Sequence, residues 1–221
     1  MKIINYQHII WDWNGTLLND VKLCADIMNN LLKTRSLPTI TLEKYREIFT
    51  FPVKDYYIKA GYDFVHESFE EISVDFIAEY ESRKGGCTLY PFAAEILQMF
   101  HSLKIKQHLL SAYKQNNLEE IIKHFGIEEY FNSVRGLDHI YADGKMELGK
   151  QLMNNISSND KENKILLIGD TIHDYEVADG LNTDCILISN GHQNSEQLNT
   201  LNIPVYNNLE EIFLLLNKER N

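Results

Sequence analysis

Residues 164–170 read KILLIGD, which is the clearest sign of a buried strand in this chain. The aliphatic side chains of Ile165 to Ile168 are consecutive, and a glycine and an acid follow them. An uninterrupted apolar run of this length is typical of a strand buried on both faces of a parallel sheet. One helical pattern precedes the run and another follows it to Ala178. Parallel strands need such crossover helices, so this segment predicts a β-α-β arrangement.

The same alternation of short apolar runs and helical patterns extends over most of the chain. Further strands are predicted at 8–12, at 105–111, near Val134, at 185–188 and near Val205. Further helices are predicted at 91–103, 116–125, 147–156 and 209–216. Successive crossover units of this kind predict an α/β fold, with a Rossmann-like core of three layers in which a parallel sheet lies between helices.

Residues 20–84 break this rhythm, because they show helical periodicity and no strong strand signal. Apolar side chains recur at helical spacing in three stretches, at 20–35, 53–60 and 67–80. Gly85 and Gly86 then have the composition of a hinge. We therefore predict two domains, an α/β core formed by residues 1–18 and 86–221 and an inserted α-helical cap domain formed by residues 19–85.

Composition and charge exclude several classes of protein. Of the 221 residues, 32 are acidic and 21 are basic, which gives a formal net charge of −11 at pH 7. Diffuse negative charge argues against nucleic-acid binding, and no stretch approaches the roughly 20 apolar residues of a membrane helix. The N-terminal run is too short and too polar for a signal peptide, and three widely spaced cysteines suggest reduced thiols. We expect a cytoplasmic monomer without nucleic-acid or membrane partners.

Polar side chains end three of the predicted strands. Asp12 and Asp170 each follow an apolar run, and Ser111 ends a third strand. The carboxyl ends of parallel strands meet at one edge of the sheet, where ligands bind, so these side chains are expected to converge. A single aspartate after a strand often only caps the next helix. Two carboxylates and a hydroxyl together favour a functional site.

These strand ends carry motifs that resemble those of the haloacid dehalogenase-like superfamily. The sequence WDWNGTLL at 11–18 resembles its first motif, hhhDxDGT, and GDTIHD at 169–174 resembles its fourth, GDxxxD. The run LLS at 109–111 resembles the second motif, and Lys145 matches the third, a lysine at a helix start. The helical insertion between motifs one and two is similar to that of the phosphoglycolate phosphatase-like branch, whose helical cap lies there.

The resemblance implies a Mg²⁺-dependent phosphatase that acts on a small phosphorylated metabolite through an aspartyl-phosphate at Asp12. Asp12, Asp170 and the backbone carbonyl of Asn14 would hold Mg²⁺, which prefers oxygen ligands. Lys145 would neutralise the charge of the phosphate and of the nucleophile. Asp174 would complete the acidic cluster by orienting its neighbours or through a metal-bound water.

Phosphate oxygens would be bound by one hydroxyl and two backbone amides, those of Ser111, Gly15 and Ala112. The third motif leaves an alternative open, because Lys150 lies further along the same predicted helix. We favour Lys145, since the Asp-Gly pair at 143–144 places it at the entry of that helix.

Asn14 departs from the family pattern, in which an aspartate usually protonates the leaving group and later activates water. An amide does not transfer protons in this way, and general acid–base help is typically worth about 10²–10⁴-fold. A slow enzyme, a substrate with a good leaving group, or another proton carrier would each account for it. His173 and His192 are candidate carriers, although an ordinary loop histidine is the simpler interpretation. Asn14→Asp would restore proton transfer unless neighbouring carboxylates repel the added charge.

There are three alternatives to a phosphatase. The chain would be a catalytically impaired phosphate-binding or regulatory protein if Asn14 marks a lost activity. A metal-independent dehalogenase also lacks the second aspartate, but it would leave the acidic fourth motif unexplained. A receiver-like protein also phosphorylates an aspartate on a parallel sheet, but it fits the insertion and the length poorly. The sequence does not identify the substrate.

Overall fold

A six-stranded, wholly parallel sheet forms the centre of the computed structural model, which describes residues 2–142, 144–157 and 164–220. The strand order is β5-β4-β1-β6-β7-β8. Adjacent strands pair in parallel at every step of this order. The strands are β1 (His8–Trp11), β4 (Lys106–Lys114), β5 (Ser133–Leu137), β6 (Ile165–Gly169), β7 (Asp184–Ile188) and β8 (Val205–Tyr206). The run that reads KILLIGD is therefore a central strand, and all its strand residues are buried.

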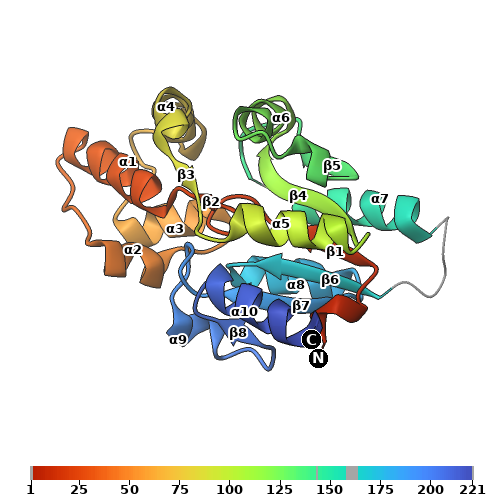
Figure 1. The fold of residues 1–221 in the computed structure, drawn as a ribbon. Coiled ribbons are helices and arrows are strands. Elements are labelled where there is room, and N and C mark those ends of the chain that lie inside the picture. The colour runs from red at the N-terminus through yellow and green to blue at the C-terminus, as the bar shows by residue number, and fades with distance from the viewer. Residues whose placement is uncertain (1, 143, 158–163, 221) are drawn as a thin grey trace.

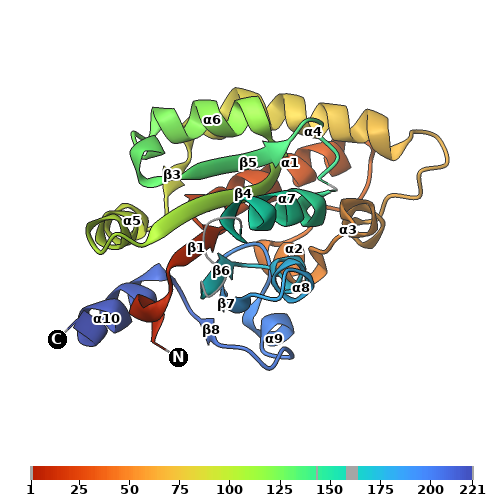
Figure 2. The same cartoon turned by 90° about the vertical axis from the view of Figure 1, so that its right-hand side faces the viewer.

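Helices cover both faces of this sheet, which confirms the predicted α/β fold of three layers (Figures 1 and 2). One face carries α5 (Ala93–Ser102), α6 (Gln115–His124) and α10 (Leu209–Arg220), and the other carries α7 (Lys145–Ser157) and α8 (Ile172–Gly180). The short elements are η1 (Ile3–Asn5), η2 (Lys84–Gly86), η3 (Glu128–Tyr130) and α9 (Ser195–Leu198). Side chains of β1 alternate between the two layers, since Trp11 and Ile10 belong to different apolar clusters.

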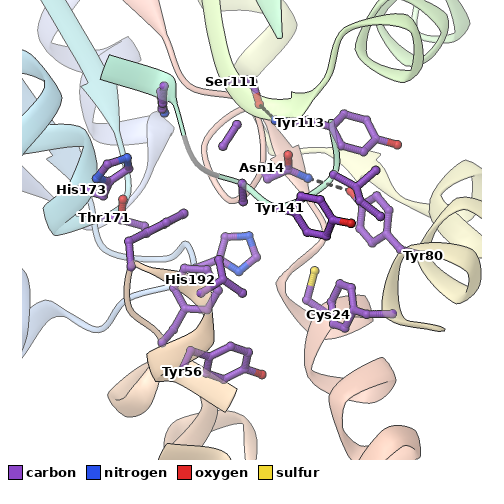
Figure 3. A pocket seen from close by; sticks show the side chains of 18 of the residues that line it. Asn14, Cys24, Tyr56, Tyr80, Ser111, Tyr113, Tyr141, Thr171, His173 and His192 are labelled. Carbon is purple, nitrogen blue, oxygen red and sulfur yellow. Dashed lines mark hydrogen bonds between the residues drawn. The ribbon is translucent and has the colours of Figure 1, made fainter. Parts of the chain in front are cut away.

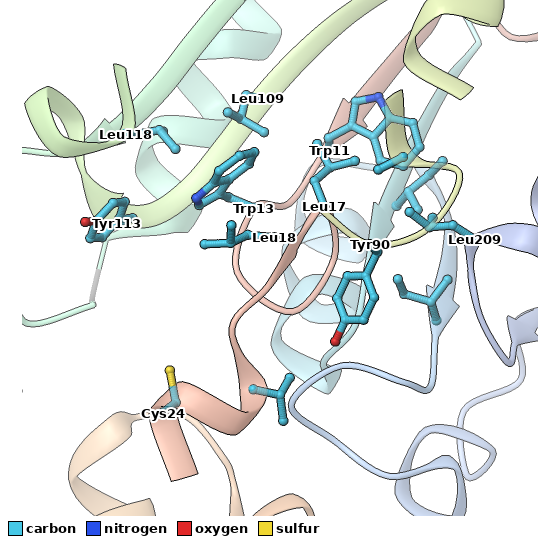
Figure 4. Close-up of a cluster of buried hydrophobic side chains, with 14 of the residues drawn as sticks. Trp11, Trp13, Leu17, Leu18, Cys24, Tyr90, Leu109, Tyr113, Leu118 and Leu209 are labelled. Carbon is cyan, nitrogen blue, oxygen red and sulfur yellow. The ribbon is translucent and has the colours of Figure 1, made fainter. Parts of the chain in front are cut away.

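Two tryptophans anchor the apolar layer on either side of Asp12 (Figure 4). Trp11 and Trp13 are both fully buried. The indole N–H of Trp11 donates to the side-chain oxygen of Gln107 at 3.0 Å, which satisfies a polar group inside the core. The ring of Trp13 packs against Phe125, with 6.2 Å between the ring centroids. These contacts fix the backbone on either side of Asp12.

Four helices lie between β1 and α5 in the chain, in the segment that was expected to be helical. They are α1 (Val21–Thr34), α2 (Leu42–Ile48), α3 (Val53–Ala60) and α4 (Phe69–Arg83), and we call them the cap helices. Ser68 and Glu71 form a capping box that starts α4, and Gly61 ends α3 in the left-handed region with φ +116°. The division into core and cap domains at residues 19 and 85 remains a prediction.

A short antiparallel pair marks where the chain leaves and rejoins the core, and the sequence analysis did not predict it. β2 (Leu18–Asn19) pairs with β3 (Thr88–Leu89). Strands of two residues carry no periodicity, which is why the pattern missed them. The expected hinge at Gly85 and Gly86 is a turn of 3₁₀ helix. Across the described part of the chain, no helix is long and apolar enough to cross a membrane.

Candidate active site

The carboxyl ends of β1 and β6 bring two aspartates together. Asp12 follows β1 directly, and its backbone N–H donates to Ile168 of β6 at 2.9 Å. Asp170 follows β6, and Asp174 lies in the first turn of α8. One carboxylate oxygen from each of the three aspartates lies within 4.8 Å of the others, and all three side chains are buried. Residues 158 positions apart in sequence therefore meet because their strands are neighbours.

Lys145 is the cation of this cluster. It begins α7, it is 3% exposed, and its Nζ lies 2.5 Å from Asp12 Oδ1 and 2.5 Å from Asp174 Oδ1. Burial alone would lower the pKa of Lys145, but the two carboxylates outweigh it and raise the pKa above its usual value. Lys150 points away from the site and pairs with Glu147 at 3.6 Å on the surface. The sequence argument for Lys145 used the pair Asp143-Gly144 to mark the start of the helix. Asp143 lies outside the described residues.

The three carboxylates differ in pKa because their surroundings differ. Burial raises the pKa of Asp12 to about 6 and that of Asp170 to about 8. Burial would also raise the pKa of Asp174, but Lys145 and the hydroxyl of Thr171 hold it below its usual value. Lys145 lowers the pKa of Asp12 but does not offset its burial in full, so the buried carboxylates still have too little positive charge beside them. Asp12 and Asp170 therefore offer hard oxygen donors that fit a divalent cation such as Mg²⁺.

The loop after Asp12 is folded tightly over Asp170. The hydroxyl of Thr16 donates to Asp170 at 2.8 Å, and the backbone N–H of His192 donates to the same carboxylate at 2.7 Å. Gly15 has φ +76°, and a Cβ there would lie 2.3 Å from Asp170 Oδ2. Only glycine fits this position, because both the backbone conformation and the space exclude a side chain.

Asn14 is held by acceptors that the sequence analysis did not identify. Its side-chain amide donates to the hydroxyl of Tyr80 at 2.7 Å (Figure 3). The same amide donates to Asp20 at 2.7 Å, and Tyr80 in turn donates to Asp20 at 2.9 Å. Asp20 immediately precedes α1, and it also accepts from the N–H of Gly15 at 3.0 Å. The amide hydrogens of Asn14 therefore point into a structural network.

Asp20 forms a buried ion pair with His192. The Nε2 of His192 lies 3.4 Å from Asp20, and its Nδ1 lies 2.7 Å from the hydroxyl of Tyr45 in α2. Although burial alone would lower the pKa of His192, Asp20 raises it, and His192 keeps the pKa of Asp20 below its usual value. A candidate proton carrier is thus engaged at both ring nitrogens. The only feature of the sequence that pointed to His192 was its position after Gly191, in the loop that follows β7.

The remaining predicted residues line one cavity of about 170 Å³ between the core and the cap helices. Ser111 and Ala112 reach it from β4, and the Ser111 hydroxyl accepts from the N–H of Tyr113 at 3.1 Å. His173 lies at its edge, stacked on Phe51 with 4.5 Å between ring centroids. Lys114, also on β4, lines the cavity and was not singled out from the sequence.

Residues 9–188 match the family of haloacid dehalogenase-like hydrolases. The chain therefore belongs to this family, which confirms the resemblance drawn from its motifs and the prediction of an enzyme that hydrolyses phosphoric monoesters. The phosphoglycolate phosphatase of Rhodobacter capsulatus is 22% identical over 189 residues, which cover 84% of this chain and 85% of that protein.

Two solved structures have the same fold at low sequence identity. A haloacid dehalogenase-like family protein from Streptococcus pneumoniae is 16% identical with a TM-score of 0.76, and the match covers 96% of this chain and 99% of that one. CbbY from Rhodobacter sphaeroides, solved in complex with phosphate, is 16% identical with a TM-score of 0.68, and the match covers 94% and 96%.

Proposed function

We propose that this chain is a Mg²⁺-dependent phosphatase of small phosphorylated metabolites that works through an aspartyl-phosphate at Asp12. One observation carries the proposal: the buried carboxylate of Asp12 lies between Lys145 and Asp170, at the floor of a cavity closed by the cap helices. A carboxylate so placed can attack phosphorus, since charge neutralisation and positioning are the main requirements of phosphoryl transfer. Cytoplasmic location and a monomeric state remain predictions.

The residues of the chain divide the work as follows. An oxygen of Asp12 forms a bond to phosphorus while the bond to the leaving group breaks, and water then releases phosphate from the acyl phosphate. Lys145 neutralises charge at Asp12 throughout, and Ser111 with the backbone amide of Ala112 binds phosphate oxygens. The backbone N–H of Gly15, which was also expected to bind phosphate, donates instead to Asp20 and to the carbonyl of Leu18. Asp12, Asp170 and the Asn14 carbonyl would hold Mg²⁺, which would neutralise the phosphate charge when bound.

The first test removes the nucleophile. Asp12→Asn should abolish phosphatase turnover while the circular dichroism spectrum stays native, because a carboxamide is a poor nucleophile toward phosphorus. Beryllium fluoride should bind the native protein as an acyl-phosphate mimic and should not bind the variant. Asp170→Ala should abolish the Mg²⁺-dependent activity, because the variant loses a proposed oxygen ligand. Retention of most of the rate in Asp12→Asn would show that the covalent mechanism is wrong.

A matched pair of lysine variants tests the third motif. Lys145→Met should lower kcat/KM by at least about 10²-fold, which is the scale of losing one preorganised charge in a buried site. Lys150→Met removes the same charge from the same helix at an exposed position, and it should leave kcat/KM unchanged. Equal losses in both variants would contradict the assignment.

Asn14 favours a second candidate, a catalytically impaired protein that binds phosphate in a regulatory role. Its amide is committed to Asp20 and Tyr80, so it transfers no proton. Beryllium fluoride binding at Asp12 without turnover of any phosphate monoester would favour this second function. A metal-independent dehalogenase remains less favoured, because it leaves the buried acidic pair of Asp170 and Asp174 without a role.

A further inference from the structure

The cap side of the cavity is apolar and aromatic. Its wall is formed by side chains from α3, α4 and the segment before α3, among them Phe49, Phe51, Val53, Tyr57, Phe76 and Ile77. Among the described residues that line the cavity, the cap helices contribute no lysine and no arginine. The charged Asp20 beside α1 already pairs with His192. The part of a substrate that faces the cap therefore meets hydrocarbon and aromatic rings.

The cationic lysines of the cavity lie on the other side. Lys145 and Lys114 both come from the core, next to the carboxyl ends of the strands. Arg46 of α2 is directed elsewhere, because its guanidinium donates to the backbone carbonyls of Gly191 at 3.0 Å and Asn190 at 2.8 Å. A carboxylate on the leaving group would lie against the cap without a positive partner, which is unfavourable in a buried site.

The hydrogen bonds of Asn14 to Asp20 and Tyr80 bear on the chemistry of the leaving group in a second, independent way. With no acid at this position, and with both ring nitrogens of His192 engaged, a leaving group that departs without a proton is favoured. A phenol has a pKa of about 10, whereas an aliphatic alkoxide resembles hydroxide, whose conjugate acid has a pKa of about 15.7. A phenolate is therefore a far better leaving group in this site than an alkoxide.

We propose that the substrate is a phosphate monoester of an apolar, aromatic alcohol, a phenol without a carboxylate. This inference rests on the proposed function and names its substrate class. The bond from Asp12 to phosphorus forms as the aryl oxygen leaves with the electron pair, and solvent later protonates the phenolate. The ring of the leaving group packs among the aromatic side chains of the cap wall, where offset and edge contacts stabilise it.

Turnover of paired substrates tests both halves of the proposal. Phenyl phosphate and cyclohexyl phosphate are similar in size but differ in leaving-group pKa, so kcat should be about 10²–10⁴-fold higher for phenyl phosphate. In the series from methyl to hexyl phosphate the leaving-group pKa is nearly constant. KM should then fall by up to about fourfold for each methylene that enters the cavity. A KM that is independent of chain length would overturn the proposal that the leaving group binds against the apolar wall of the cavity.

A pair of lysine substitutions on α3 provides a matched control. Val53 lines the cavity, whereas Ile58 on the same helix is 51% exposed and does not. Val53→Lys should raise KM for phenyl phosphate at least about tenfold, as expected for a charge placed in an apolar wall, and should lower KM for phosphoglycolate. Ile58→Lys should leave both values unchanged. Identical behaviour of the two variants would contradict the inference.

Binding of substrate analogues that resist hydrolysis separates this inference from the proposed function. In the Mg²⁺-loaded protein, phenylphosphonate should bind at least about tenfold more tightly than phosphonoacetate, measured by calorimetry. If phosphonoacetate binds as tightly or more tightly, the substrate class is wrong, whether or not the protein is a phosphatase. If phenylphosphonate is preferred but no phosphate monoester is hydrolysed, the binding preference stands and the phosphatase proposal fails.

Discussion

Asn14 lies at hydrogen-bonding distance from a carboxylate, and this decides which side chain the position accepts. Its amide donates at 2.7 Å to Asp20, a buried group that His192 keeps ionised. An aspartate at the same place would bring two buried carboxylates into contact. Like charges in a buried site raise one of the two pKa values strongly, so the pair would share a proton or separate. The simple restoration of a general acid, which the sequence favours, meets this obstacle.

Asn14→Asp should therefore destabilise the protein, and more so at higher pH. The added carboxylate has a raised pKa in the folded state, so the stability loss is small near pH 5 and grows as pH rises toward that pKa. Melting temperatures at pH 5 and pH 8 measure the difference. Asn154→Asp adds the same charge at an exposed position of α7 and serves as the control. A variant as stable as the control at pH 8 would contradict the explanation.

Some site residues could be predicted from sequence motifs, and others were found only in the structure. The difference lies in whether a local sequence pattern fixes the position of the residue. Asp12, Asp170 and Lys145 stand at strand or helix ends, where local pattern and parallel topology fix their positions. Asp20 and His192 meet from segments 172 positions apart, and nothing near either residue indicates the other. A hydrogen-bond network that depends on a tertiary contact between cap and core leaves no local pattern in the sequence. For this reason the sequence analysis named only His192, as a candidate proton carrier, and did not identify Asp20.

At the scale of elements, the pairing of β1 with β4 buries two histidines beside each other. The rings of His8 and His108 stack at 5.2 Å, and the Nε2 of His108 lies 2.9 Å from the Nδ1 of His8. Ser133 of β5 lies 2.8 Å from the other ring nitrogen of His108. Burial lowers the pKa of His108 to about 4, and the nearby His8 and Lys106 add to this effect.

This arrangement predicts acid sensitivity. The unfolded chain binds a proton at the His108 position below about pH 6.5, whereas the folded chain does so only below about pH 4, so stability falls as pH drops through this window. The loss amounts to at most roughly 3 kcal/mol. His108→Gln should flatten the dependence of the unfolding free energy on pH between 4 and 6.5. His66→Gln, at an exposed position of the cap, should leave the slope unchanged, and an equal slope in His108→Gln would refute the assignment.

Long elements were predictable and short ones were not. The sheet strands and the flanking helices follow from periodicity, because each presents an apolar face to one of two layers. β4 extends to Lys114, beyond the predicted end at Ser111, with a register irregularity between Leu110 and Lys114. The extension places Tyr113 and Lys114 at the cavity. Tyr113 is buried there and Lys114 is half-buried. Their burial depends on the cap helices that cover that edge of the sheet, so the sequence of the strand alone did not indicate it.

At the scale of the whole molecule, the cap helices and the core meet at the loop that follows β7. The hydroxyl of Tyr45 contacts His192, the side chain of Gln193 donates to the carbonyl of Phe49 at 2.8 Å, and Arg46 donates to two carbonyls of the loop. The same loop supplies the backbone N–H that binds Asp170. Closure of the cap over the cavity is thus linked through one loop to the geometry of the proposed metal site.

Arg46→Ala should loosen this closure. The substitution removes two charge-assisted hydrogen bonds that are partly exposed, for which a loss of about 1–2 kcal/mol is reasonable. If substrate binds only beneath the docked cap, KM should rise roughly 5- to 30-fold while kcat at saturation changes little, because saturating substrate restores the docked cap and the geometry around Asp12. Solution X-ray scattering should show a larger radius of gyration in the variant.

Arg83→Ala provides the comparison, since Arg83 pairs with Glu79 at 2.5 Å and with Asp26 at 3.9 Å, both on the cap helices themselves. It removes the same side chain without touching the core, so KM and the radius of gyration should stay at the native values. If the two variants behave alike, the contacts of Arg46 do not hold the cap closed. Closure would then depend on the buried ion pair of Asp20 and His192 and on the apolar contacts around it.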